Sequence, residues 1–437
     1  MIFLIHSETT DGTIDANLGL PEYSYYFVLR AFRPLLEEMG LTVAVADPER
    51  EVDRLARNAR RHGETCVFLS FSPPHRRTYV ARDCPTIPVF AWEFDAIPTE
   101  SWDDDPRNDW RTVLAATGRA ITHSRFAAEA VTRAMGASYD VASLPAPVWD
   151  AYAPLHVAQA VPELGRQRTL RVRGRVYDSR AIDFAPYVPL RCPKHVHPAL
   201  PDHAGSRESE RDITLDGVIY TAVFCPLDGR KNWFDMICAF CLVMRERADA
   251  TLVLKLTHHR CDEVIGAMMK DLAKLPPFAC RIVIIDGYLC DDSYRRLAAA
   301  SHFTLNTSHG EGQCLPLMEY MSAGKPAVTP VHSSMRDYVT GENAFLVRSH
   351  PEPTSWPHDP RQMYRTLRHR IDFESLMAAL DESYRVARTD PARYARMAQA
   401  AHDGLRRHCS RAAIRDGLAA FLTAQPSVRP QRVKASA

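Results

Sequence analysis

Two glutamates, Glu311 and Glu319, stand eight positions apart in the segment TSHGEGQCLPLMEYMSAGKPAV at 307–328. Carboxylates accept hydrogen bonds from the hydroxyl groups of a ligand, and free backbone N–H groups at the start of a helix bind phosphate oxygens. Pro316 suits the first turn of a helix, so we expect Glu311 in a loop and Glu319 on the helix that follows. The segment therefore predicts a site for a ligand that carries both hydroxyl and phosphate groups.

The residues on either side of the two glutamates predict the strands and the helix that position them. A strand-like run, HFTLNTS, precedes the loop, and Gly324 followed by KPAVTPV indicates the end of the helix and the next strand. Ligands of a parallel α/β sheet lie beyond the carboxyl ends of its strands, where this loop is expected. The backbone N–H groups available there belong to Gly312, Gln313, Cys314 and Leu315.

Two adjacent cations, Arg230 and Lys231, follow another apolar run in VFCPLDGRKNWFDMICAF. Two positive charges between the end of a strand and the start of a helix suit a diphosphate, whose negative charge grows as a bonded group departs. The alternative is a solvated basic turn. Lys255, in TLVLKLT, ends the next strand, where it either lines the same cleft or is only a structural lysine.

The spacing of Glu311 and Glu319, with the flanking LPLMEYMSAGKPAV, resembles the signature of the retaining glycosyltransferases of family 4, glycosyl transferases group 1. This resemblance implies an α/β chain with the GT-B fold, in which two Rossmann-like domains face a central cleft and C-terminal helices return to the first domain. It also implies a nucleotide diphosphate sugar as co-substrate, with no metal and no other cofactor. An amphipathic helix with a solvated Glu319 is the alternative.

The resemblance assigns roles to the residues of these two segments. Arg230 and Lys231 would hold the diphosphate and, together with Glu311, form the catalytic set. Glu319 would bind the ribose, while Glu311 and the amides of residues 312–315 would bind the sugar.

The first half of the chain offers further matches to the same family. Gly19, in NLGLPEYSYYF, is similar to the glycine-rich first loop that lets the backbone approach the diphosphate, although many relatives have two glycines there. His123 and Ser124, in AITHSRFAAEAV, match the segment at the end of a strand that faces the cleft. Ser124 is equally suited to cap the helix that follows.

The segment AWEFDAIPTESW at 91–102 follows a strand and concentrates aromatic and acidic side chains suited to stacking on a sugar and hydrogen-bonding it. These side chains are Trp92, Glu93, Asp95 and Trp102. With His123, the first three are the predicted acceptor-binding residues. Ordinary packing of the loop is the alternative.

Length and composition fit a globular protein of two domains. The chain has 437 residues, 46% of them hydrophobic and 24% charged, and a formal net charge of +1, which argues against a nucleic-acid partner. Its apolar runs are shorter than a membrane span requires, and polar residues interrupt MIFLIHSETT too early for a signal peptide. We expect a cytoplasmic protein, with peripheral contact to the inner face of the membrane as a further option.

The eleven cysteines, an odd number, favour reduced thiols in the core over a disulfide framework. Cys238 and Cys241 form a CxxC within a helical run and are expected to pack in the core. The segment CPKHVH at 192–197 has no partner cluster, so we do not expect it to hold a metal.

Strand and helix patterns alternate along the chain except between about 150 and 212, where Pro, Arg and His accumulate. The expected domains are 1–150 (acceptor domain), 151–212 (insertion and linker), 213–390 (donor domain), 391–424 (helices returning to the first domain) and 425–437 (a flexible tail).

Within the insertion, RTLRVRGRVY at 168–177 alternates apolar residues with Arg171, Arg173 and Arg175. Period-two spacing would place the three guanidinium groups on one face of a strand. Such a face could bind an anionic lipid-linked acceptor or a membrane surface, or it could be a solvated edge that avoids aggregation.

The sequence thus favours a retaining glycosyltransferase that moves a hexose-type sugar to a glycan or lipid-linked acceptor in bacterial surface polysaccharide synthesis. A nucleotide-sugar epimerase or hydrolase of the same fold would share the diphosphate site and lack an acceptor site. A non-catalytic subunit of a polysaccharide assembly complex would be indicated by loss of the donor residues, which are intact.

Overall fold

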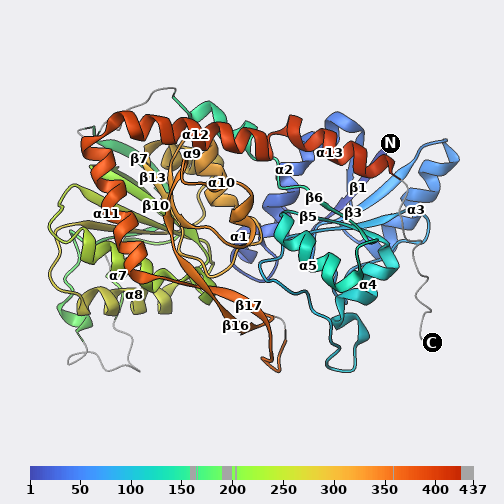
Figure 1. Cartoon of the computed structure of the whole chain (residues 1–437), viewed down its shortest axis with the longest axis horizontal. Helices are drawn as coiled ribbons and strands as arrows, with labels where there is room; N and C mark the ends of the chain where they lie inside the picture. The colour runs from blue at the N-terminus through green and yellow to red at the C-terminus, as the bar shows by residue number, and fades with distance from the viewer. Residues whose placement is uncertain (158–163, 165, 189–198, 202–203, 358, 425–437) are drawn as a thin grey trace.

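The computed structural model describes residues 1–157, 164, 166–188, 199–201, 204–357 and 359–424. Two α/β units lie side by side along the long axis of the molecule, each built on a mostly parallel sheet (Figure 1). The expected pair of Rossmann-like units is confirmed. The CPKHVH segment at 192–197 and the tail expected at 425–437 lie outside the described residues.

The first sheet contains six strands, all parallel, in the order β2-β1-β3-β4-β5-β6. The strands are β1 (Ile2–His6), β2 (Leu41–Ala44), β3 (Cys66–Ser70), β4 (Thr86–Phe90), β5 (Arg119–Thr122) and β6 (Asp140–Ser143), and the helices are α1 (Ile14–Asn17), α2 (Ser24–Met39), α3 (Pro48–Arg61), α4 (Trp110–Thr117) and α5 (Arg125–Met135). The central strands are buried along almost their whole length, which explains their near-continuous apolar sequence.

The second sheet has the order β15-β14-β13-β10-β11-β12-β8, and only its edge strand β8 is antiparallel to its neighbour. The strands are β8 (Arg175–Asp178), β10 (Val218–Phe224), β11 (Ala250–Leu256), β12 (Arg281–Asp286), β13 (Phe303–Leu305), β14 (Ala327–Pro330) and β15 (Ala344–Val347), and the helices are α7 (Trp233–Val243), α8 (Asp262–Lys274), α9 (Asp291–Ala300), α10 (Leu315–Ser322) and α11 (Phe373–Thr389). Cys238 and Cys241 are buried on α7, which confirms that they belong to the core.

The arginine-rich segment at 168–177 forms two strands rather than one. Gly174, with φ +139°, separates β7 (Arg168–Arg173) from β8, and β7 pairs with β9 (Glu210–Leu215). A Cβ at this glycine would lie 2.6 Å from the Asp286 carbonyl oxygen, so the chain passes too close to β12 for any side chain there.

The expected strip of three guanidinium groups is therefore wrong. Arg175 lies in β8 and pairs with the fully buried carboxylate of Asp286 at 2.5 Å, whereas Arg171 pairs with the exposed Glu210 at 2.7 Å. Segment 151–212, expected as an insertion, also supplies an edge strand to the second sheet.

Two connections between the units lie together at one edge of the molecule. The first contains α6 (Trp149–Tyr152), and the second runs through α12 (Pro391–Cys409) into α13 (Arg411–Thr423). The Trp149 indole donates to the His402 carbonyl at 3.0 Å, and the rings of His156 and His402 stack at 4.4 Å. Side chains of α12 and α13 join the core of the first unit, so the expected return of the C-terminal helices is confirmed (Figure 1).

A hairpin that the sequence pattern does not predict lies at the opposite edge. It consists of β16 (Ser349–Ser355) and β17 (Tyr364–Ile371), and it reaches from the second unit to the 91–102 loop of the first (Figure 1). The Trp356 indole stacks on Trp102 with ring centroids 6.4 Å apart and donates to the Ala96 carbonyl at 2.9 Å. We refer to residues 349–371 as the bridging hairpin.

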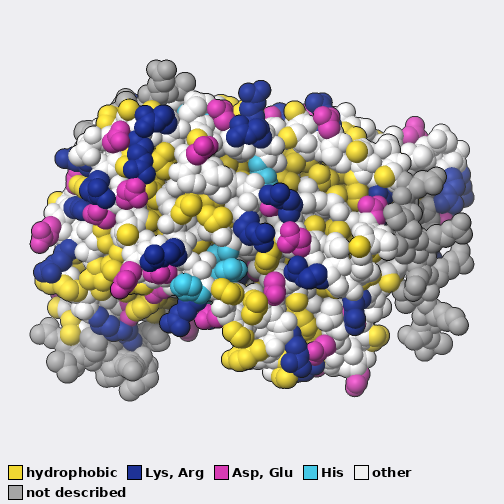
Figure 2. All heavy atoms as spheres, in the orientation of Figure 1, with side chains coloured by type: hydrophobic (Ala, Val, Ile, Leu, Met, Phe, Trp, Pro, Cys, Tyr) yellow, Lys and Arg dark blue, Asp and Glu magenta, His cyan; other side chains and the backbone are white. Residues whose placement is uncertain are grey.

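Acidic and basic side chains are interspersed on the face drawn in Figure 2, and neither sign covers a continuous area, in keeping with the net charge of +1. Among the described residues, none of the helices combines the length and apolarity needed to cross a bilayer.

Candidate functional site

A cavity of about 600 Å³ lies between the two units, at the carboxyl ends of the strands of the second sheet. The first unit contributes the loop before α2 and the loop after β4, and the second contributes the loops after β10, β12 and β13. It is lined by all the predicted catalytic and donor-binding residues, namely Gly19, Arg230, Lys231, Lys255, Glu311, Gly312, Gln313, Cys314, Leu315 and Glu319. The structure thus brings together residues that are up to 300 positions apart in the sequence.

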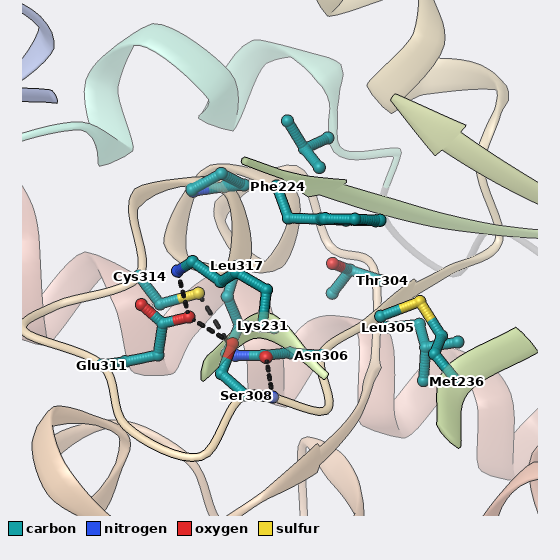
Figure 3. Close-up of a pocket in the computed structure, with 12 residues that line it drawn as sticks. Phe224, Lys231, Met236, Thr304, Leu305, Asn306, Ser308, Glu311, Cys314 and Leu317 are labelled. Carbon is teal, nitrogen blue, oxygen red and sulfur yellow. Dashed lines mark hydrogen bonds and ion pairs between the residues drawn. The ribbon is translucent and has the colours of Figure 1, made fainter. Parts of the chain in front are cut away.

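Glu311 lies in the loop after β13, as expected, and is only 4% exposed. Its Oε1 accepts from Lys231 Nζ at 2.6 Å and from Ser308 Oγ at 2.5 Å, and Figure 3 shows these two groups converging on the carboxylate. Burial would raise the pKa of Glu311, but Lys231 and Arg230 outweigh that effect and lower it to about 2. Glu311 is therefore ionised across the physiological range and fixes the position of Lys231.

Arg230 connects the two units. Its Nε lies 3.2 Å from Glu93 Oε1 of the first unit and 2.9 Å from Asp228 Oδ2, and its Nη1 donates to the Gly310 carbonyl at 2.7 Å. Burial raises the pKa of Glu93, and the charge of Arg230 opposes that shift. The predicted cationic turn is therefore not solvated, because its side chains point into the cleft and are held by carboxylates.

Helix α10 begins at the cavity without a side-chain cap, and α7 begins close to the cavity-lining Lys231, also without one. The N-cap of α10 is Cys314 and that of α7 is Asn232, both in the left-handed conformation, with φ +59° and +51°. Ser, Asp or Thr side chains usually satisfy the first N–H groups of a helix, so these two starts leave backbone donors for a ligand. Gly312 is needed just before α10, since a Cβ there would lie 2.7 Å from that of Ala91.

Glu319 is on α10, as expected, and faces the same cavity. Its Oε2 accepts from the Tyr294 hydroxyl on α9 at 2.7 Å. Burial raises the pKa of Glu319 to about 7, and the hydrogen bond from Tyr294 only partly opposes the shift. Unlike Glu311, this carboxylate has no cation within ion-pair distance among the described residues.

The first loop of the chain, which carries Gly19, touches the segment that follows β11, the strand that carries Lys255. Gly19 has φ +84°, and a Cβ there would overlap the ring of His258 at 2.3 Å. The ammonium group of Lys255 donates to the Leu256 carbonyl at 3.0 Å and also lines the cavity.

Of the four predicted acceptor-binding residues, two line the cavity and two do not. Glu93 lines the cavity opposite Arg230, and Trp92 also lines it, although its ring is buried and packs on Trp110 at 4.6 Å. Asp95 and His123 are not among the described residues that line it. The loop-packing alternative therefore holds for most of the 91–102 segment.

Asp95 instead fastens the bridging hairpin, because its Oδ1 accepts from Thr366 Oγ1 at 2.7 Å and from the Leu367 N–H at 2.9 Å. His123 is 1% exposed and contacts the Leu144 carbonyl through Nδ1 at 2.9 Å, and burial lowers its pKa to about 4. Ser124 caps α5 by accepting from the Ala127 N–H at 3.1 Å.

Sequence reasoning missed three residues that shape the site: Asp228, Ser308 and Tyr294. Asp228 and Ser308 are each within three positions of a predicted residue, so the polar character of both loops was a usable signal. Tyr294 lies on α9, and nothing in its local sequence points to Glu319.

One group of three possible metal ligands exists among the described residues, Glu8, Glu22 and His75. Arg77 donates to both carboxylates, at 3.0 and 2.6 Å, so a cation already occupies the position between them. The expectation that no metal takes part remains a prediction.

Comparison with known proteins agrees with this geometry. The family described as Glycosyl transferases group 1 matches residues 236–363, which include Glu311, Glu319 and the helices around them. No curated protein matches the chain significantly.

Solved structures resemble the chain over most of its length. Sucrose-phosphate synthase from Thermosynechococcus elongatus is 12% identical with a TM-score of 0.55, and the match covers 96% of this chain and 98% of that one. Anabaena HepE in complex with UDP and glucose is 14% identical with a TM-score of 0.51, covering 97% and 99%. S. aureus TarM, at 9% identity and a TM-score of 0.49, matches 82% of this chain, which spans only 55% of the TarM chain. The GT-B fold and the resemblance to group 1 glycosyltransferases, both expected from the sequence, are confirmed.

Proposed function

We propose that this chain is a retaining glycosyltransferase that moves a hexose-type sugar from a nucleotide diphosphate sugar to a hydroxyl of a glycan or lipid-linked acceptor. One observation carries the proposal. In a cavity between two Rossmann-like units, Glu311 is held between Lys231 and Arg230, and Glu319 faces the same space beside an uncapped helix start.

The donor would occupy the second unit. Lys231 Nζ has three N–H donors and gives one to Glu311, so two remain for oxygens of the diphosphate. The backbone N–H groups of Gly312, Gln313, Cys314 and Leu315 add neutral donors at the positive end of α10. Glu319 accepts from the ribose hydroxyls, and Glu311 accepts from hydroxyls of the transferred sugar through the oxygen that Lys231 does not use.

The acceptor would approach from the first unit, where Glu93 lies opposite Arg230. The bond between the anomeric carbon and the diphosphate oxygen breaks, and the acceptor oxygen bonds to the same face of that carbon. The acceptor proton passes to the departing phosphate oxygen, so no separate base is required. Lys231 and Arg230 stabilise the charge on the diphosphate as it separates.

Incubating the purified chain with a panel of nucleotide sugars, with and without glycan acceptors, tests this function. Transfer only in the presence of an acceptor supports it. Equal turnover of the donor without an acceptor would identify a hydrolase or epimerase, and absence of any turnover despite binding would favour a non-catalytic subunit.

The product is expected to keep the anomeric configuration of the donor, so an α-linked nucleotide sugar should give an α-glycoside. The reason is that Glu311 is engaged by Lys231 and Ser308, and Glu93 by Arg230, so neither is free as a base on the opposite face of the sugar. Proton NMR of the first-formed product measures the configuration. A β-glycoside from an α-donor would contradict the prediction and make Glu93 the first candidate base.

Donor affinity is expected to rise about tenfold between pH 6 and pH 8. The pKa of Glu319 is raised to about 7, and its carboxylate form accepts two ribose hydroxyls where the protonated form accepts fewer. Calorimetric titration with an intact nucleotide sugar, which has no terminal phosphate to titrate, measures the change. Glu319→Gln should bind more weakly with a flat pH profile, and an equally steep profile in this variant would assign the titration to another group.

The resemblance further suggests a role in bacterial surface polysaccharide synthesis at the cytoplasmic side of the membrane. Of the three arginines in the segment at 168–177 that were expected to form a strip, Arg171 and Arg173 are exposed on β7 and are available for peripheral membrane contact. Co-sedimentation with anionic lipid vesicles, compared with an Arg171→Gln and Arg173→Gln double variant, tests that contact.

A further inference from the structure

Lys255 is the most deeply buried cation that lines the cavity. Only 4% of it is exposed, and its Nζ makes a single hydrogen bond, to the Leu256 carbonyl at 3.0 Å, among the described residues. No carboxylate of those residues lies within ion-pair distance of it. An ammonium group has three N–H donors, so two of them have no hydrogen-bond partner in the part of the chain that the structure describes.

This arrangement is costly for the folded protein. Burial lowers the pKa of Lys255 to about 8, because the charged form loses its hydration and gains too little in return. Lys325 also has one backbone partner, Ala299 at 3.1 Å, but it is more exposed and does not line the cavity. Burial lowers the pKa of Lys325 as well, to about 7, but only Lys255 is placed to meet a ligand in the cavity.

The position of Lys255 in the sheet decides which part of a donor it would meet. The neighbours of Lys255 along β11, Leu254 and Leu256, point to the face covered by α7 and α8. Lys255 therefore points to the opposite face, as do Val253 of the same strand and Ile285, the residue of β12 that pairs with Lys255. Tyr294 of α9 packs on that face and donates to Glu319.

In the sheet, β10 and β12 lie on opposite sides of β11. Arg230 and Lys231 follow β10, and Lys231 extends toward β13 to contact Glu311. We therefore place Lys255 on the nucleoside side of the cavity, because the face of the sheet to which it points is the one on which Tyr294, the partner of Glu319, packs.

We propose that Lys255 selects the base of the donor by donating to an exocyclic carbonyl oxygen, O4 of uracil or O6 of guanine. Cytosine and adenine carry an amino group at the equivalent position, which offers donors and would oppose the ammonium group. The assignment rests on the proposed function, since it needs a nucleotide sugar whose ribose binds Glu319.

Calorimetric titration of the full chain with UDP, CDP, GDP and ADP tests this assignment, because uracil and cytosine have nearly the same shape and differ at this position and at N3. The wild type is expected to bind UDP at least tenfold more tightly than CDP, or GDP at least tenfold more tightly than ADP. Lys255→Met should reduce that preference to threefold or less while keeping the affinity for the amino nucleotide. Lys325→Met, the matched control, should keep the wild-type preference.

Thermal unfolding without ligand provides a second readout. Lys255→Met is expected to melt at the same temperature as the wild type or higher, because a buried and poorly paired charge is replaced by an apolar side chain of similar length. A folded variant with weaker uracil or guanine binding would exclude a merely structural lysine.

Three results would overturn the assignment. An unchanged base preference in Lys255→Met would remove Lys255 from base selection. An equal loss for all four nucleotides and for inorganic pyrophosphate would place it on the diphosphate. Failure of the wild type to bind any nucleotide would instead refute the proposed function itself, and the assignment with it.

Discussion

Replacing Lys231 by alanine is expected to lower turnover a hundredfold or more while the protein remains folded. The substitution removes a charge aimed at the departing diphosphate, and electrostatic stabilisation of this kind is worth about 2.7–4 kcal/mol per group in enzymes. It also removes the hydrogen bond that fixes the Glu311 carboxylate, leaving Ser308 and Arg230 as its partners.

Initial rates at saturating nucleotide sugar measure this effect, and circular dichroism with thermal unfolding confirms the fold. Lys274→Ala is a matched control, because that lysine pairs with Asp271 on the exposed side of α8. Wild-type kinetics in a folded Lys231→Ala variant would remove Lys231 from the site and leave the diphosphate to Arg230 and the backbone.

Replacing Trp356 by alanine is expected to lower the free energy of unfolding by about 3 kcal/mol, the usual cost of truncating a buried tryptophan. Only 1% of this side chain is exposed, it stacks on Trp102, and its indole N–H satisfies the Ala96 carbonyl. Chemical denaturation followed by circular dichroism measures the loss.

Tyr364→Ala on the same hairpin is the control and should change stability by less than about 0.5 kcal/mol, since 73% of Tyr364 is exposed. Equal losses for the two variants would mean that the bridging hairpin is not anchored through Trp356.

The sequence allowed the donor side of the site to be predicted because its residues are close together along the chain. A loop glutamate, a helix start with Pro316 and a Gly324 stop are all local signals, and the apolar runs of the buried strands are equally local. Arg230 and Lys231 were found for the same reason. Even so, their pairing with Glu311 spans 80 residues and could be known only from the fold.

The residues of the acceptor side could not be predicted from local sequence signals. Trp92 and Asp95 suit sugar binding and loop packing equally by residue type, and what decides between them is the bridging hairpin, which joins Asp95 to Thr366 from 271 positions away. That hairpin gave no clear signal, because the SHPEPTS strand is rich in proline and polar residues. The arginine strip failed at Gly174, where close approach to β12 divides the strand in two.

The two connections between the units lie together at one edge of the molecule, and the bridging hairpin lies at the opposite edge (Figure 1). Because both connections lie at this edge, a rotation of one unit relative to the other would have its axis there. In such a rotation displacement grows with distance from the axis, so a small movement near Trp149 and His402 would give the largest separation between Trp356 and Trp102. Opening of the cleft about this edge would therefore be widest on the hairpin side and would require the stacked rings of Trp356 and Trp102 to separate.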